Sequence, residues 1–474
     1  MHSIPSKGRS YNEVLEEMES FRQKDVNYHE GRTWSLVYHL NNEHTDFLKQ
    51  AHGLYFSENA LNPMAFRSLK RFEHEVIRMT ADVLHGDENV VGTMTSGGTE
   101  SCLLPVLTYR ELAKSKKRFG SFAPEMIAPE SIHVAWAKGA KYFGVKMVPI
   151  PLQENYQVDL NSLKKKINKN TIMIVASAPS YPHGVIDPIE ELGLIAVSHK
   201  IPFHVDSCLG GFMLPFIEME GYKVKPFDFR VPGVTSISAD VHKYGFAAKG
   251  ASTVLYRNMD YLKHQFFIHQ DWPGGIFASP ALLGTRPGGS IAAAWAALNA
   301  IGLDGYRKIA GTIMETTKIL IDGINGIEGL KVMGKPAMSV FAFTSKDREV
   351  NIFAVGDQME ERGWHVDRLQ RPEGLHAMVT PAHQKVTEKY LEDLKKSVEI
   401  VRLDPKLGAK GNAAMYGMIA NMPFRKLIKK EVLKMMEKMY GPECEMPLDE
   451  PGKESLPIKI GAKILNKINW LRKK

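Results

Sequence analysis

Cysteine is scarce in this chain, and the three that occur, Cys102, Cys208 and Cys444, lie far apart. This spacing excludes a disulfide framework and matches no zinc motif, so we expect no metal site and a reducing, cytoplasmic environment. Long apolar runs are also absent, since no segment approaches the ~20 residues of a membrane-spanning helix. The first residues, MHSIPSKGRSYNEV, lack the apolar stretch of a secretory signal.

The surplus of positive charge is small. Lys and Arg number 61 against 53 Asp and Glu among 474 residues, which gives a formal net charge of +8. The basic residues are spread along the chain, without an RNP-like aromatic motif or a long arginine tract. We therefore expect no nucleic-acid partner.

The end of the chain is the exception to this even spread. An apolar stripe at helical spacing, followed by a basic terminus, is formed by Ile460, Ile464, Leu465, Ile468 and Leu471. A basic amphipathic helix of this kind is typical of peripheral contact with a membrane. The alternative is a helix that packs on the body or on a neighbouring subunit.

Short apolar segments alternate with helix-length segments between about residues 90 and 257. The apolar segments are VVGTMT, MIAP, KMVPIPL, TIMIVASAP, PFHVDSC, TSISAD and STVLYR, and the helical ones include 98–114, 132–143, 160–168 and 188–199. Strands that are apolar on both faces and separated by helices indicate an α/β fold with a mostly parallel central sheet. Such sheets bind ligands outside the carboxyl ends of their strands.

A Gly- and Pro-rich stretch at 271–289 ends this alternation and leads into an Ala-rich helix. Beyond residue 306, a smaller α+β domain is predicted by short strands near 338–344, 364–369 and 375–380 and helices near 350–362 and 386–401. The expected parts are an N-terminal segment (1–57), a large domain (58–305), a small C-terminal domain (306–420) and a helical tail (421–474).

Three motifs fall at predicted strand ends. Thr95-Ser96-Gly97-Gly98-Thr99-Glu100 lies between a strand and a helix, where glycines let backbone N–H groups approach a phosphate. His204-Val205-Asp206 ends another strand, and a carboxylate there can pair with a protonated pyridine nitrogen. Taken alone, Asp206 would more simply be a helix N-cap.

The third motif is Ser238-x-x-x-His242-Lys243, again after a strand. Apolar surroundings and nearby cations would favour the neutral amine of Lys243, the form that makes Schiff bases. A surface lysine would be the simpler interpretation of that residue alone. The phosphate turn, the strand-end acid and the His-Lys pair, in this order, predict an enzyme that binds pyridoxal phosphate (PLP) through Lys243.

The strings TSGGTES, HVDSCLGGF and SISADVHKYGFAAKG resemble the signatures of the sphingosine-1-phosphate lyase family, which are fold-type I PLP enzymes of the group II decarboxylase superfamily. PFDFRVPGVTSISAD, DWPGGIFASP, GTRPGG and SAPSYPHGVIDP also match, and the resemblance runs from about residue 31 to about residue 420. It implies retro-aldol cleavage of the C2–C3 bond of phosphorylated sphingoid bases, giving a long-chain aldehyde and phosphoethanolamine. It also implies a homodimer with sites at the interface.

The family's eukaryotic members carry a membrane-spanning N-terminus that is missing here, which favours a bacterial source. For a pathogen, we would expect delivery into a host cell.

The resemblance assigns a set of residues to the cofactor. They are Gly98, Thr99, His133, His204, Asp206, His242, Lys243 and, from a partner subunit, Thr285. Gly98, Thr99 and His242 would hold the cofactor phosphate. His133 would stack over the ring, although it could simply cap a helix, and His204 would lie near the ring oxygen. Lys243, Asp206 and His133 would be the catalytic residues.

The substrate phosphate would be held by Tyr38, Asn59 and Lys249, with Tyr181 lining the same entrance; aromatic packing is the alternative for both tyrosines. The family's SNPLHP-like segment departs here, because Asn62 stands where the family has His. Asparagine donates a neutral hydrogen bond but cannot carry charge or move a proton.

Two other functions stay open at this point. An amino-acid decarboxylase of the same superfamily, acting on glutamate or an aromatic amino acid, would share the cofactor residues and release carbon dioxide instead of an aldehyde. A non-catalytic, membrane-binding protein of the same fold would be yellow but inert.

Overall fold

The computed structural model describes residues 3–23, 25–116, 122–421 and 425–442. Its largest feature is a seven-stranded sheet of order β1-β7-β6-β5-β4-β2-β3. The strands are β1 (Val91–Thr95), β2 (Glu125–Pro129), β3 (Lys146–Ile150), β4 (Thr171–Ser177), β5 (Phe203–Asp206), β6 (Val234–Ala239) and β7 (Ser252–Tyr256). Only β7 runs against its neighbours, pairing antiparallel with both β1 and β6. The predicted mostly parallel sheet is confirmed.

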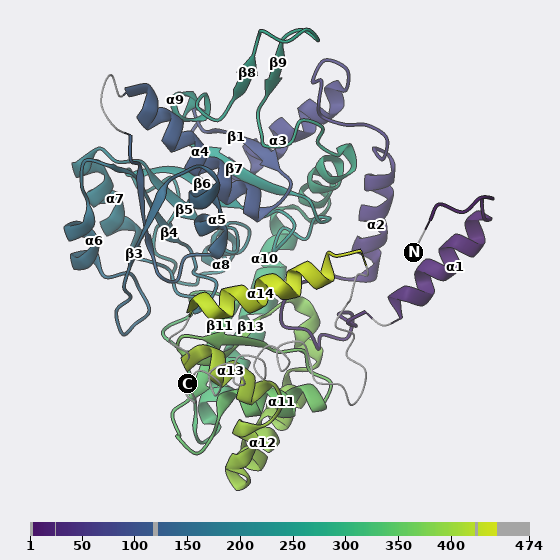
Figure 1. Ribbon diagram of the computed structural model, residues 1–474, viewed down its shortest axis with the longest axis vertical. Coiled ribbons are helices and arrows are strands. Elements are labelled where there is room, and N and C mark those ends of the chain that lie inside the picture. The colour runs from purple at the N-terminus through teal and green to yellow at the C-terminus, as the bar shows by residue number, and fades with distance from the viewer. Residues whose placement is uncertain (1–2, 24, 117–121, 422–424, 443–474) are drawn as a thin grey trace, which may run out of the picture.

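Helices cover both faces of this sheet (Figure 1). They include α3 (Arg67–Val83), α4 (Gly98–Lys116), α5 (Val134–Tyr142), α6 (Leu160–Lys166), α7 (Ile189–His199), α8 (Leu214–Met219) and α9 (Met259–Leu262). Alternate residues of β4 enter different cores: Met173 and Val175 pack with α4 and α5, whereas Ile174 and Ala176 pack with α7 and α8. A strand buried on both faces is mostly apolar at successive positions, which is why β4 reads as an apolar run from residue 172 to residue 176.

A second, antiparallel sheet of order β10-β11-β13-β12 follows in the C-terminal part. It consists of β10 (Leu330–Val332), β11 (Val340–Ser345), β12 (Asp367–Gln370) and β13 (Glu373–Met378), with α11 (Ile352–Glu361), α12 (Thr387–Leu403) and α13 (Gly411–Asn421). The long α10 (Gly288–Gly326) connects the two sheets and bends at Gly302, whose φ is 64°. The predicted smaller α+β unit is thus present. One apolar core continues through both sheets, so the boundary at residue 305 stays a prediction.

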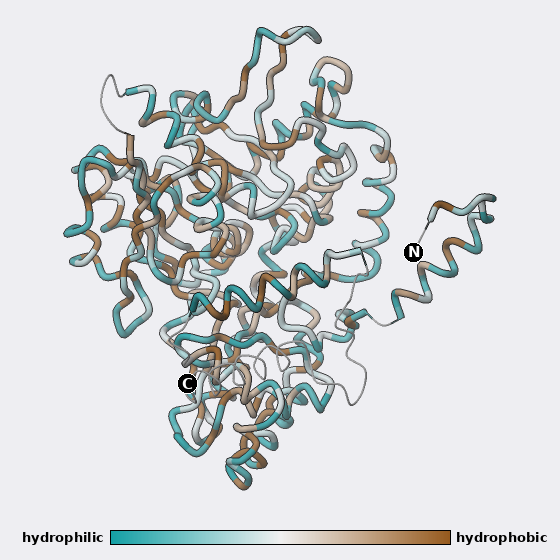
Figure 2. Tube along the Cα trace, in the orientation of Figure 1, coloured by the Kyte–Doolittle hydropathy of each residue, from teal (hydrophilic) through white to brown (hydrophobic). Residues whose placement is uncertain are grey.

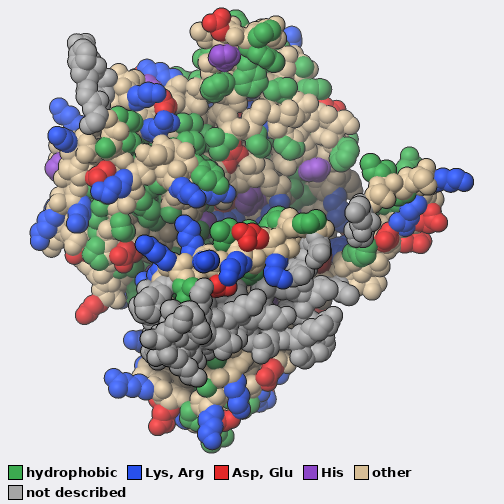
Figure 3. Space-filling model, in the orientation of Figure 1, with side chains coloured by type: hydrophobic (Ala, Val, Ile, Leu, Met, Phe, Trp, Pro, Cys, Tyr) green, Lys and Arg blue, Asp and Glu red, His purple; other side chains and the backbone are tan. Residues whose placement is uncertain are grey.

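Several elements lie at the periphery. Figure 1 shows α1 (Tyr11–Arg22) projecting from the body and the hairpin of β8 (Phe267–His269) and β9 (Phe277–Ser279) extending from it. The helix α14 (Arg425–Met439) crosses the middle of this view, where Figure 3 shows a gathering of Lys and Arg side chains. In Figure 2 brown, apolar segments concentrate inside the body, but they also occur along α1.

Within the described ranges, every helix is too short or too polar to span a bilayer. The apolar stripe predicted at 460–471 lies outside the described residues.

Candidate active site

The loops that follow β1, β5 and β6 meet around one cavity of about 390 Å³. Its wall includes predicted cofactor residues from all three loops: Gly98, Thr99, Asp206, His242 and Lys243. The lining is completed by Ser96, Gly97, Glu100, Cys102, His133, Ser177, Pro179, Tyr181, Cys208, Leu209 and Asp240. The volume falls in the range of roughly 300–1,000 Å³ that is usual for small-molecule sites.

Lys243 is held by an acid that the sequence analysis passed over. Its Nζ lies 2.9 Å from Oδ2 of Asp240, which is fully buried at the end of β6. Burial lowers the pKa of Lys243, but the charge of Asp240 outweighs this and holds the pKa well above its ordinary value. The expectation that the surroundings favour a neutral Lys243 is therefore wrong for the chain without its cofactor. His242 adds no positive charge that would favour the neutral amine of Lys243, because burial lowers the pKa of His242 to about 4 and leaves its ring neutral.

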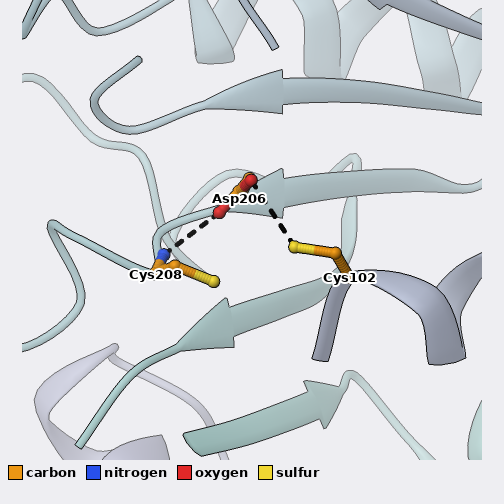
Figure 4. Close-up of side chains that lie close together, drawn as sticks. All are labelled: Cys102, Asp206 and Cys208. Carbon is orange, nitrogen blue, oxygen red and sulfur yellow. Dashed lines mark hydrogen bonds between the residues drawn. The ribbon is translucent and has the colours of Figure 1, made fainter. Parts of the chain in front are cut away.

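Asp206 is buried at the end of β5 and receives several donors. The indole Nε1 of Trp136 donates to Oδ2 at 2.8 Å, and the backbone N–H of Cys208 donates to Oδ1 at 3.2 Å. The thiol of Cys102 donates to Oδ2 at 3.7 Å, as Figure 4 shows. Burial raises the pKa of Asp206, but the Trp136 hydrogen bond and nearby positive groups bring it below the ordinary value. Asp206 is thus a fixed carboxylate that can face a protonated ring nitrogen.

The turn after β1 forms a cradle suited to an anion. The first N–H groups of α4 have no acceptor within the helix, and Thr99 and His242 stand beside them in the wall. A Cβ on Gly98 would lie 2.5 Å from Oδ2 of Asp240, so only glycine allows this close approach. The negative charge of Glu100 is not left free to occupy the cradle, because its carboxylate accepts hydrogen bonds from Ser96 N (2.7 Å) and Leu282 N (2.9 Å).

His133 caps a helix and also lines the cavity, while its stacking over a cofactor ring stays a prediction. Its Nδ1 accepts from Ala135 N at 3.2 Å, which caps α5, and its ring lines the cavity 6.2 Å from that of Tyr181. Burial lowers the pKa of His133 and raises that of Tyr181 to about 12, so both side chains are neutral near pH 7.

His204 lies behind the cavity, outside its lining. Both ring nitrogens contact hydroxyls of β6, Ser236 at 2.7 Å and Ser238 at 3.1 Å. Burial lowers its pKa to about 3, so the ring is neutral. This placement gives His204 no contact with the cavity, and its role beside the ring oxygen stays a prediction.

A second cavity, of about 510 Å³, holds Tyr38 and Lys249. The Lys249 Nζ lies 5.1 Å from the centre of the Tyr38 ring and donates to the carbonyl of His242 at 3.4 Å. Lys249 therefore lines the second cavity and contacts the backbone of His242, a residue that lines the first. Desolvation and the charge of Lys243 lower the pKa of Lys249 to about 8.

Like His204, the predicted residues Asn59 and Thr285 line neither cavity, and neither does Asn62, which stands in place of the family's His. Asn59 pairs through its backbone with Pro287 and accepts from Leu61 N with Oδ1 at 3.1 Å. The exposed Asn62 accepts from Met64 N at 2.9 Å, which is a local turn contact. Thr285 is exposed near the start of α10. The roles of Asn59 at the substrate phosphate and of Thr285 in a partner's cofactor site stay predictions.

Asp240 and Trp136 are the functional residues that the sequence analysis missed. Asp240 ends β6 just as Asp206 ends β5, so the rule that ligands lie at strand ends could have found it. Trp136 follows His133 by three residues on one helix, a spacing that puts both side chains on the same face. That face turns toward the cavity.

The residues fit PLP. A lysine amine, a fixed carboxylate and an N–H-rich cradle line one cavity, and these match the aldehyde, the ring nitrogen and the phosphate of that cofactor. Gly98, Thr99 and His242 would hold the phosphate, Asp206 the ring nitrogen and Lys243 the carbonyl carbon.

Comparison with known proteins gives consistent matches. Residues 60–346 match the pyridoxal-dependent decarboxylase conserved domain. The sphingosine-1-phosphate lyase of Arabidopsis thaliana is 45% identical over 92% of this chain and 81% of its own length. Sphingosine-1-phosphate lyase 1 of Rattus norvegicus is 42% identical over 93% of this chain and 77% of its own length. The structure of a Burkholderia pseudomallei sphingosine-1-phosphate lyase superposes with a TM-score of 0.82 at 39% identity, covering 89% of this chain and 98% of that one.

Proposed function

The chain belongs to the sphingosine-1-phosphate lyases, within the pyridoxal-dependent decarboxylase family, and we propose that it cleaves phosphorylated sphingoid bases between C2 and C3. It is a PLP-dependent lyase, and the products would be a long-chain aldehyde and phosphoethanolamine. The observation that carries the choice of substrate is the position of Lys249, which lines a second cavity and donates to the backbone carbonyl of His242, a residue of the cofactor cavity. A cation there suits a substrate that bears a phosphate.

Bound PLP supplies an electron-accepting ring that stabilises negative charge on the carbon beside the substrate amine. Asp206 keeps the proton on the ring nitrogen, because its own pKa is low and its oxygens are held by Trp136 and Cys208. Lys243 must lose a proton before its amine can bond to a carbonyl carbon, and Asp240, at 2.9 Å, is placed to accept it.

Lys249 and Tyr38 would decide which bond breaks. An anchored phosphate fixes the rotation of the substrate about the bond to its amine, and the bond held perpendicular to the ring plane is the one that cleaves. A decarboxylase would need to anchor its substrate so that the carboxylate takes this position. The cationic amine 5.1 Å from the Tyr38 ring supports the phosphate-anchoring alternative.

The direct test is a product assay with the purified, PLP-loaded chain and a phosphorylated sphingoid base. We expect an aldehyde and phosphoethanolamine in equal amounts by mass spectrometry. Lys243→Ala should lose both turnover and the visible absorbance of the lysine-bound cofactor, whereas Lys164→Ala, on the exposed face of α6, should keep both. Carbon dioxide from glutamate or an aromatic amino acid, without aldehyde, would identify a decarboxylase. A yellow protein inert toward all of these would be non-catalytic.

Two further parts of the proposal concern assembly and location. Thr285 is exposed in the single chain, and we place it in the cofactor site of a second subunit. The basic tail would give peripheral contact with a membrane surface. Deleting residues 456–474 should then weaken binding to anionic vesicles in a flotation assay, and equal binding would assign the tail to packing.

A further inference from the structure

Two thiols and a carboxylate meet in the wall of the cofactor cavity. Cys102 comes from the first turns of α4, and Asp206 and Cys208 come from the end of β5 and the loop after it (Figure 4). All three side chains are buried, yet all three line the cavity, so a small ion in solution can reach them. The donor atoms lie within 4.8 Å of one another.

This spacing is that of a soft-metal site. Around a tetrahedral Zn²⁺, bonds of ~2.3 Å to sulfur and ~2.1 Å to oxygen place a sulfur and an oxygen about 3.6 Å apart. The Cys102 sulfur lies 3.7 Å from Oδ2 of Asp206, so these two donors already have that separation. The Cys208 side chain needs only a small adjustment, since its sulfur is within 4.8 Å of both. Two sulfurs among three donors select soft ions over Mg²⁺ or Ca²⁺.

We propose that, in the chain without its cofactor, Cys102, Asp206 and Cys208 bind one thiophilic divalent cation, which excludes PLP. The two thiols release two protons to solvent, the carboxylate binds as it stands, and a water from the cavity takes the fourth position. The exclusion follows because the ion takes Asp206, the acid that the ring nitrogen needs. The site is thus inhibitory, which is compatible with a reaction that uses no metal.

The sequence could not reveal this site, because its two cysteines are far apart in the chain and match no zinc spacing. The inference depends on the assignment of Asp206 to the cofactor, but not on the identity of the substrate. Ion binding can be read directly, so its failure is distinguishable from a failure of the lyase assay.

The test uses the full-length chain, freed of PLP and kept reduced, with CdCl2 as the probe. We expect one Cd²⁺ per chain by elemental analysis and a thiolate-to-metal charge-transfer band in the ultraviolet. Both should be lost in Cys102→Ser and Cys208→Ser and kept in Cys444→Ser, which controls for the remaining cysteine. A band that is absent, or that persists at full size in Cys102→Ser, would overturn the proposal.

A competition measurement covers the case in which a serine variant does not fold. In the unmodified chain, the PLP concentration that gives half-maximal lysine-bound absorbance should rise in proportion to free Cd²⁺ once the ion exceeds its dissociation constant. Added PLP should in turn release the ion, and Mg²⁺ should have no effect. If PLP and Cd²⁺ bind independently, the site does not share Asp206 and the proposal is wrong.

Discussion

The charge of Lys249 changes with pH just above neutrality. Its pKa of about 8 means that the amine is charged below this pH and neutral above it. The second pKa of a phosphate monoester is about 6, so the substrate keeps its charge across this range. We therefore expect kcat/KM for a phosphorylated substrate to fall as the pH rises through about 8. Pre-steady-state binding should show that the loss is in substrate affinity.

Lys249→Arg is the matched control for this pH effect. The guanidinium stays charged to beyond pH 12, so the variant should lose the decline above pH 8 even if its activity at neutral pH is lower. Identical pH profiles for the two proteins would show that another group titrates, and would remove Lys249 from the substrate site.

Trp136 is expected to act through Asp206. Trp136→Phe removes the indole N–H that donates to Oδ2 at 2.8 Å but keeps an aromatic ring in the buried site. The pKa of Asp206 should rise, because burial, which opposes its charge, is then less well compensated. A hydrogen bond to a charged group contributes roughly 1.5–3 kcal/mol, so the single-turnover rate should fall at least about tenfold with PLP saturating.

Trp364 provides the comparison for that variant. Its Nε1 donates to Asp393 at 3.0 Å, also in a buried place but in the C-terminal core. Trp364→Phe should lower the Tm and leave the single-turnover rate unchanged. If both variants lower the rate equally, the effect of Trp136 is one of general packing.

Among the secondary-structure elements, the start of α4 is the one that the site constrains most. A methyl group at Gly98 would lie 2.5 Å from Asp240, the partner of Lys243, so either the helix start or the ion pair must move. Crowding of this kind costs roughly 1–3 kcal/mol. We expect Gly98→Ala to weaken PLP binding about tenfold in an absorbance titration. Gly326→Ala, at the open end of α10 with no atom within 4 Å, should not change it.

A secondary-structure element could be predicted when the types of its own residues showed that it is buried. β4 is apolar from residue 172 to residue 176, all of them buried, so its sequence alone marks a central strand. The direction of β7 was not predicted, because it depends on the short connection through Lys243 back to the sheet. The hairpin of β8 and β9 was missed because each strand has only three residues, set among Gly and Pro.

Site residues, too, could be predicted only where their own stretch of sequence determines their surroundings. Lys243 and Asp206 were found because each follows its own strand. The placement of His204 outside the cavity lining could not be predicted, because the serines that contact its nitrogens belong to the neighbouring strand β6 and no local pattern shows such a pairing. The charge of Lys243 was judged wrongly for a similar reason, since its environment is set by the ion pair with Asp240 as well as by burial.

At the scale of the whole molecule, one chain exposes surfaces that indicate a partner. The helix α1 has no buried residue and exposes an apolar set, Tyr11, Val14, Leu15, Met18 and Phe21, on an element that projects from the body (Figures 1 and 2). The β8–β9 hairpin region exposes Phe267, Ile268, Trp272 and Ile276. Clusters of exposed apolar side chains mark interaction sites, and an isolated short helix is unstable in water. Both features support the proposed homodimer.

A heterodimer of two inactive chains would test this assembly and the role of Thr285 together. Thr285→Glu would place a negative charge in the cofactor site that Thr285 serves, and Lys243→Ala would remove the cofactor's covalent attachment. If Thr285 serves the partner's site, a co-expressed heterodimer carrying one substitution in each chain has one site with both residues intact, so it should show about half the wild-type activity per dimer. If Thr285 served its own chain's site, neither site would be intact and the heterodimer would be inactive. Separate affinity tags on the two chains isolate the mixed species, and light scattering establishes its mass before the aldehyde assay.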